Sequence, residues 1–133
     1  MREVQFLTFS DVMEIHDYQI RNFGGSGGLR DIDLLKSAIG MPESSFGGIL
    51  LHPTVYEMAA AYLYHLVENH PFIDGNKRVG AMAALIFLDI NNIEFEAPPE
   101  LFTRMVMEVA CGKMLKADIA VFLKKYSRSA EIT

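Results

Sequence analysis

The most reactive side chains of the sequence are concentrated in one nine-residue segment, HPFIDGNKR, which spans residues 70–78. Histidine gains and loses a proton near neutral pH, so His70 can take the proton of an attacking hydroxyl group. Asp74 offers the hard oxygen ligand that magnesium requires. Lys77 and Arg78 add two positive charges that can neutralise phosphate groups. These residue types together indicate phosphoryl or nucleotidyl transfer.

The segment stands directly before an apolar stretch that is expected to form a buried helix over residues 76–91. The free amide groups and the dipole at the start of such a helix favour a bound anion. Basic residues in the first turn oppose that dipole, so stability alone would favour acidic ones there. Gly75 allows a ligand to approach the backbone closely. Phe72 and Ile73 are apolar and are expected to pin the loop to the core.

The hydrophobic spacing elsewhere predicts an all-α fold, a compact bundle of about six helices in a single domain over residues 1–133. Ser10, Asp31 and Thr54 are suitable N-cap residues for the first three helices. His16 stands beside an apolar stripe and is expected to be a packed histidine. The predicted helices cover residues 10–20, 31–40, 54–69, 76–91, 98–111 and 116–126.

The connections between these helices contain fewer sequence patterns that predict structure or function. The glycine-rich segment 22–28 lacks the Lys-Ser/Thr pair of a phosphate-binding loop and is predicted to be a flexible connection. Residues 41–53 are predicted to form a loop or short hairpin, a flap before the central helices that aligns a target segment. His52, within it, is expected to be exposed. Residues 93–96 are expected to be extended, and the polar tail after Tyr126 is expected to fray.

The composition limits the possible partners and location. The net charge is −5 and the twelve basic residues form no long run, which argues against direct nucleic acid binding. The most apolar run, residues 79–90, is too short to span a bilayer, and the N-terminus does not resemble a signal peptide. We therefore expect a cytoplasmic protein that does not bind membranes. The lone Cys111 cannot form an internal disulfide and is expected to be incidental.

The segment 70–78 resembles the signature of the Fic/Doc family, HPFx(D/E)GN(G/K)R, at every defined position. The similarity extends to EIHD at residues 14–17, to the glycine-rich segment and to the helices on both sides of the signature. In length and layout the chain is most similar to the death-on-curing (Doc) toxin branch. The resemblance implies the all-α Fic/Doc fold and a protein-modifying enzyme that uses ATP and Mg²⁺.

The resemblance also implies a role for each residue of the signature. His70 matches the base that activates the target hydroxyl, and Asp74 matches the magnesium ligand. Phe72 is expected to support the loop. The residues expected to bind the nucleotide phosphates are Gly75, Asn76, Lys77 and Arg78.

Two features bear on which group is transferred. Fic members that transfer AMP typically have glycine at the position of Lys77 and a second arginine at the position of Ala81, whereas Doc members have lysine and lack that arginine. Gly75, however, matches the AMP-transferring members, because Doc has alanine there. We favour a kinase over an AMP transferase, since the lysine side chain fills space that glycine would leave for a phosphate.

The Doc resemblance implies a toxin of a type II toxin–antitoxin module that phosphorylates a target protein, with elongation factor Tu as the candidate, and so blocks translation. The segment YHLVEN, residues 64–69, approaches the family's inhibitory motif but begins with tyrosine and lies inside the helix before the signature. Inhibition of the toxin's activity is therefore expected to come from a separate antitoxin protein.

Two other classes of function are alternatives to this hypothesis. A metallohydrolase would use His65, Glu68, His70 and Asp74, but five residues separate the histidines, which points them about 140° apart on an ideal helix. The other alternative is a catalytically inactive binding module that retains the fold. The intact set of histidine, aspartate, lysine and arginine in the signature argues against it.

Overall fold

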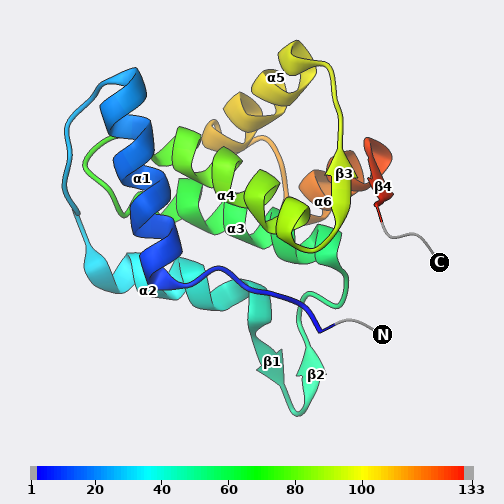
Figure 1. Ribbon diagram of the computed structural model, residues 1–133. Coiled ribbons are helices and arrows are strands. Elements are labelled where there is room, and N and C mark those ends of the chain that lie inside the picture. Colours follow the sequence, from blue (N-terminus) through cyan, green and yellow to red (C-terminus); the bar gives the residue numbers. More distant parts are fainter. Residues whose placement is uncertain (1–2, 131–133) are drawn as a thin grey trace.

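Two central helices of 15 residues each, α3 (Val55–Asn69) and α4 (Asn76–Ile90), pack along one another. The structure is a computed structural model that describes residues 3–130. Figure 1 shows the other helices arranged around this pair. Helices α2 and α6 pack on α3, α1 packs on α4, and α5 contacts both. The outer helices are α1 (Phe9–Phe23), α2 (Ile32–Gly40), α5 (Pro99–Ala110) and α6 (Lys116–Lys125). The predicted all-α fold is confirmed.

Small residues let the two central helices approach closely. The buried face of α3 contains three consecutive alanines, residues 59–61, and that of α4 contains Gly80 and two further alanines. A Cβ atom at Gly80 would lie 3.0 Å from the Cγ2 of Val67 and 3.2 Å from the carbonyl oxygen of Leu63. Larger residues, including Tyr62 and Phe87, fill the rest of the interior and are fully buried. This core supplies the rigid support from which the α3–α4 turn projects.

Local capping explains where the first three helices begin. Helix α1 begins one residue before Ser10, because Thr8 and Asp11 form a capping box in which each side chain accepts a hydrogen bond from the other's backbone N–H. The prediction of Ser10 as the cap was therefore wrong, and the helix also extends beyond residue 20. The predicted caps Asp31 and Thr54 are confirmed.

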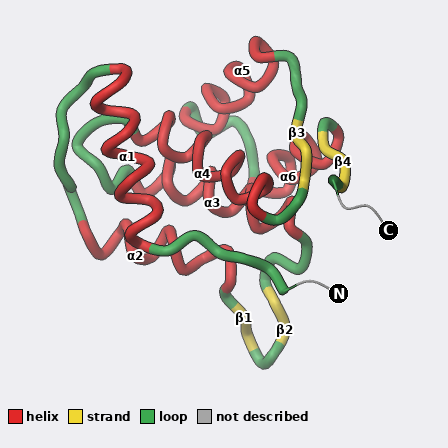
Figure 2. Tube along the Cα trace, viewed as in Figure 1, coloured by secondary structure: helices red, strands yellow, loops and turns green. Residues whose placement is uncertain are grey.

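Two short antiparallel sheets accompany the helices (Figure 2). A 3-10 turn, Met41–Glu43, leads into a hairpin of β1 (Ser45–Phe46) and β2 (Ile49–Leu50), as predicted. The extended segment β3 (Ile93–Phe95) pairs with β4 (Ser127–Ser129). Residues 127–129 were expected to fray, which was wrong, because a strand more than thirty residues earlier satisfies their backbone.

His52 is buried, not exposed as predicted. Its Nε2 atom lies 3.1 Å from the Nζ of Lys116, and the Nε2 of His65 lies 2.9 Å from the same nitrogen. Burial, and then the nearby Lys116 ammonium, lower the pKa of both histidines, that of His65 to about 4. Both rings are therefore neutral at pH 7 and can accept hydrogen bonds from the ammonium group. The three side chains join the end of the hairpin to α3 and α6.

None of the helices within residues 3–130 combines the length and apolar character needed to cross a membrane.

Candidate active site

The turn between α3 and α4 forms the wall of a pocket of about 530 Å³. The pocket lies at the C-terminal end of α3 and the N-terminal end of α4, and residues 70–78 supply seven of its nine lining residues. Six of the seven residues singled out from the sequence line it, and Phe72 lies behind them in the core. The lining residues are Val67, His70, Ile73, Asp74, Gly75, Asn76, Lys77, Arg78 and Ala110.

His70 directly follows the last residue of α3 and is exposed. Its backbone has φ 49° and ψ 53°, the left-handed conformation, which is unusual for a residue other than glycine. The conformation costs roughly 1–2 kcal/mol for a residue with a Cβ atom, so the surrounding structure must hold it. It ends α3 abruptly and leaves the imidazole at the edge of the pocket. There it is accessible from the solvent.

Phe72 and Asn76 brace the turn from inside. The Phe72 ring is fully buried. The Asn76 Oδ1 accepts a hydrogen bond of 2.9 Å from the Phe72 N–H, and its Nδ2 donates one of 2.9 Å to the Phe72 carbonyl. The Asn76 side chain is thus engaged by the turn itself, while its backbone N–H, at the first position of α4, has no partner within the helix. Ile73 is 54% exposed, so the expectation that it also packs in the core was wrong.

His16 on α1 holds the turn from the opposite side. The ring is buried and stacks on Phe72, with the ring centroids 3.9 Å apart and the planes 7° from parallel. Its Nε2 lies 3.0 Å from the carbonyl oxygen of Asp74, so this nitrogen carries the proton and donates. The prediction of a packed histidine is confirmed, but its link to the turn could not be read from its place in a helical stripe.

Backbone amide groups fix the Asp74 carboxylate. Its Oδ1 accepts a hydrogen bond of 2.8 Å from the Gly75 N–H, and its Oδ2 accepts one of 3.2 Å from the Ser26 N–H. These two bonds, with a smaller contribution from the charge of Arg78, lower the pKa of the Asp74 carboxyl. The group is exposed and ionised at neutral pH. Its oxygens have lone pairs left for a hard divalent cation, so the donor type fits Mg²⁺.

The glycine-rich segment lies directly beside the site. The Ile73 N–H donates to the carbonyl of Gly28, and Leu29 forms an isolated β-bridge with Phe72. Arg78 donates through Nη2 to the Gly24 carbonyl, at 3.1 Å. In Figures 1 and 2 this segment and the α3–α4 turn run side by side. The prediction of a merely flexible connection was therefore wrong. Its glycines do not form a phosphate-loop motif, so the sequence carried no direct signal of this contact.

The hairpin, in contrast, lies away from the site. It immediately precedes α3, whereas His70 follows the end of the same helix. A helix of 15 residues is about 22 Å long, so its two ends are widely separated. In Figure 1 the hairpin projects at the bottom of the view, whereas the α3–α4 turn lies at the left beside α1. The structure thus confirms the hairpin, but the segment beside the signature is the glycine-rich one.

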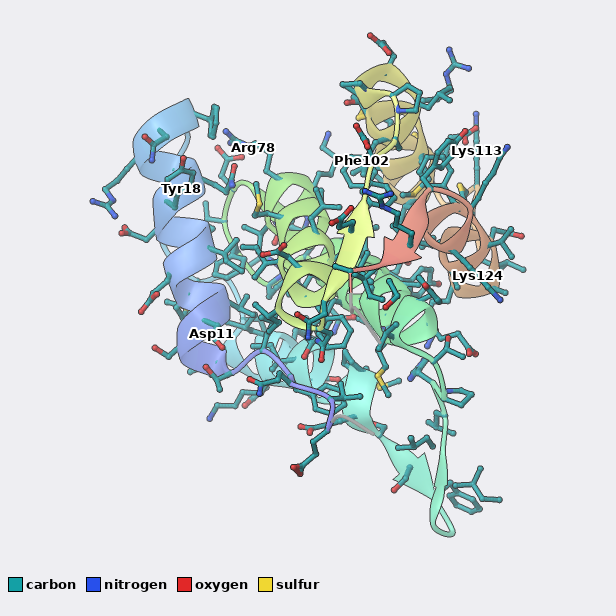
Figure 3. All side chains as sticks on the ribbon, turned by 45° about the vertical axis from the view of Figure 1, so that its right-hand side comes forward. Asp11, Tyr18, Arg78, Phe102, Lys113 and Lys124 are labelled. Atoms are coloured by element: carbon teal, nitrogen blue, oxygen red, sulfur yellow. The ribbon has the colours of Figure 1, made fainter. Side chains whose placement is uncertain are left out.

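The first turn of α4 gives the pocket a positive character. It begins at Asn76 after Gly75, which has φ 85°, and it contains no acidic residue and no side-chain cap. The amide groups of such a turn are free to bind an anion. Lys77 is exposed, and Figure 3 shows Arg78 at this end of α4, facing α1. These groups suit the binding of a polyphosphate.

The residues of the alternative metal site are not gathered in one place. His65 lies against Lys116 and not in the pocket of His70 and Asp74. Within residues 3–130, no group of three or more His, Cys, Asp or Glu side chains is arranged to hold a metal ion. The metallohydrolase hypothesis therefore has no structural basis in the described part of the chain.

Comparison with known proteins gives consistent matches. The Fic/DOC family profile matches residues 6–88. A protein of Mycolicibacterium smegmatis named "Toxin Doc" is 40% identical over 75 residues, which cover 56% of this chain and 58% of that protein. The chain thus matches less than two thirds of the length of this relative. A protein of Escherichia phage P1 named "Protein kinase doc" is 28% identical over 121 residues, 91% of this chain and 94% of that protein.

Proposed function

Because this chain belongs to the Fic/Doc family, we propose that it is a toxin that transfers the γ-phosphoryl group of ATP to a hydroxyl group of a target protein. The observation that carries the proposal is the pocket in which His70, Asp74 and Lys77 are combined with the first turn of α4. The names of the two relatives, a toxin and a protein kinase, support the same function. The toxin would act in the cytoplasm and be restrained by a separate antitoxin.

The polar and charged groups of the site each have a part in this reaction. The His70 imidazole accepts the proton of the target hydroxyl as its oxygen bonds to the γ-phosphorus and the bond to the bridging oxygen of ADP breaks. The N–H groups at the start of α4, together with Lys77 and Arg78, bind the phosphate oxygens. Asp74 would hold Mg²⁺, which when bound neutralises charge on the phosphates. Asn76 and Phe72 keep the turn in shape.

Transfer of AMP is the second candidate, and Gly75 is the residue that favours it. The backbone offers another reason for this glycine, because its φ of 85° is unfavourable for any residue with a side chain. A Cβ atom at this position would meet only ordinary contacts, the nearest at 3.5 Å from the Cδ1 of Ile20. The backbone conformation alone therefore explains why residue 75 is glycine, and the glycine need not serve to make room for a phosphate group. The side chain of Lys77, in the pocket, supports phosphoryl transfer.

The test is incubation of the purified protein with cell extract and ATP labelled at either the α or the γ phosphate. We expect γ label on a protein of the extract, and no label with His70→Ala. Purified elongation factor Tu serves as the candidate target in a parallel reaction. Label from the α phosphate would replace phosphoryl transfer by AMP transfer. Absence of label from both positions would leave the inactive binding module as the better hypothesis.

A further inference from the structure

The conformation of His70 requires support from outside the signature. Among the residues that the structure describes, only His70 and Asn92 have a positive φ without being glycine. This conformation is disfavoured by roughly 1–2 kcal/mol for a residue with a side chain, and the direction of the imidazole depends on the backbone being held there. Strained residues of this kind persist where the surrounding contacts fix them. The contacts of the His70 backbone therefore identify what positions the imidazole.

Arg30, in the connection before α2, makes those contacts. Its Nε donates a hydrogen bond of 2.6 Å to the carbonyl oxygen of His70, and its Nη2 donates one of 2.9 Å to the carbonyl oxygen of Asn69. The last carbonyl groups of a helix have no partner within the helix. One planar guanidinium group therefore satisfies two successive carbonyls at the end of α3, and its positive charge suits that end of the helix dipole.

The backbone of Arg30 is anchored to the same turn. The N–H groups of Arg30 and Asp31 both donate to the carbonyl oxygen of Pro71, at 2.7 Å and 3.0 Å. Asn69 in turn donates through Nδ2 to the carbonyl of Leu34 in α2, at 3.0 Å. The guanidinium group therefore holds Asn69 and His70 while the backbone of the same residue holds Pro71, so that Arg30 fixes the left-handed bend from both sides. Lysine carries all its N–H donors on a single nitrogen, so it cannot present the two separate donor nitrogens with which the planar guanidinium group meets these carbonyls.

We propose that Arg30 is a positioning residue that acts through His70, an inference that rests on the proposed function. Arg30 is not among the described residues that line the pocket, so its side chain has no direct part in binding the nucleotide. Its loss should therefore slow the transfer step and leave nucleotide affinity unchanged. A residue that merely stabilised the fold would instead lower the melting temperature and leave the kinetics of the folded enzyme intact.

The test compares Arg30→Lys with Arg128→Lys. Arg128 is also an exposed arginine with a paired side chain, but it contacts Glu94 in the small β3–β4 sheet. For Arg30→Lys we expect kcat to fall by roughly tenfold or more, since a small displacement of a reacting group is costly. We expect the KM for ATP to stay within about twofold and the melting temperature to stay near that of the parent. Arg128→Lys should match the parent in all three measurements.

A second readout does not need activity. The ring signals of the four histidines can be assigned by NMR, using substitution of each one in turn. In Arg30→Lys the His70 ring signals should shift or broaden as the ring samples several positions, while those of His16, His52 and His65 stay in place. If the parent transfers no label but the His70 signals respond, the proposed function fails and the positioning role stands. Unchanged His70 signals, or a kcat within about twofold of the parent, would refute the role of Arg30.

Discussion

Replacing Gly25 with alanine should disturb Asp74 while leaving the helical bundle folded. Gly25 has φ 112°, and a Cβ atom built on it would lie 2.6 Å from the Oδ2 of Asp74. This is the oxygen that accepts the hydrogen bond of the Ser26 N–H. The new methyl group and the carboxylate cannot both keep their places, so the loop or the carboxylate must move.

The size of the displacement follows from the contact. Ordinary van der Waals contact begins at 3.4 Å, so the two atoms must separate by about 0.8 Å. Misplacement of a reacting or binding group by about 1 Å can cost up to about 100-fold in rate. We expect Gly25→Ala to lower the transfer rate by roughly 10- to 100-fold. The backbone strain of alanine at this φ adds roughly 1–3 kcal/mol, within an exposed loop.

Alanine variants of two neighbouring glycines distinguish the effect of the contact with Asp74 from the effect of backbone strain. Gly24 also has a positive φ, of 85°, but a Cβ atom there meets nothing within 4 Å; Gly27 has neither a contact nor a positive φ. The assay is the rate of transfer of γ label from ATP, with urea denaturation of each variant. Gly24→Ala should report strain alone and Gly27→Ala should match the parent. If Gly25→Ala is as active as Gly24→Ala, the contact with Asp74 does not matter and the reasoning is refuted.

Three further predictions concern Asn76 and His16, which hold the turn, and His65, which lies away from the site. Asn76→Ala should lower the free energy of unfolding by about 2–4 kcal/mol, because two buried backbone groups of Phe72 lose their partners; a loss under about 1 kcal/mol in urea denaturation would contradict this. His65 has its pKa lowered to about 4, so the unfolded chain binds its proton more readily; stability should hold above about pH 6.5 and fall as the pH approaches 4. After solvent screening, the free energy of unfolding lost in this way is roughly 1–2 kcal/mol. Melting curves of His65→Asn recorded over the same pH range should lack this loss. His16→Phe keeps a ring on Phe72 but cannot donate to the Asp74 carbonyl; transfer should slow by about tenfold, and an unchanged rate in the folded variant would exclude this role.

Local patterns in the sequence were sufficient to predict the helices and the grouping of the signature residues in one turn. The N-caps Asp31 and Thr54 lie within three residues of the N–H groups that they bind, so their role depends on neighbours along the chain. The residues 70–78 likewise follow one another between two helices, and proximity in sequence brings them to one pocket. Even here, the prediction of Ser10 as the N-cap was wrong, because Thr8 and Ser10 are both suitable N-cap residues and lie within one turn of each other.

Only the tertiary structure decided which distant groups hold the turn. His16 binds Asp74, which is 58 positions away in the sequence, and Arg30 binds His70, which is 40 positions away. Neither partner can be predicted from the residue type alone. The same holds for β4, which forms because β3 lies beside it, and for His52, which is buried because Lys116 meets it from α6. Such contacts depend on how the helices pack, and their energy is gained only when the chain has already folded. The sequence by itself therefore singled out the residues that line the pocket, while the packing of α1 and of the glycine-rich segment against the turn determined how those groups are held.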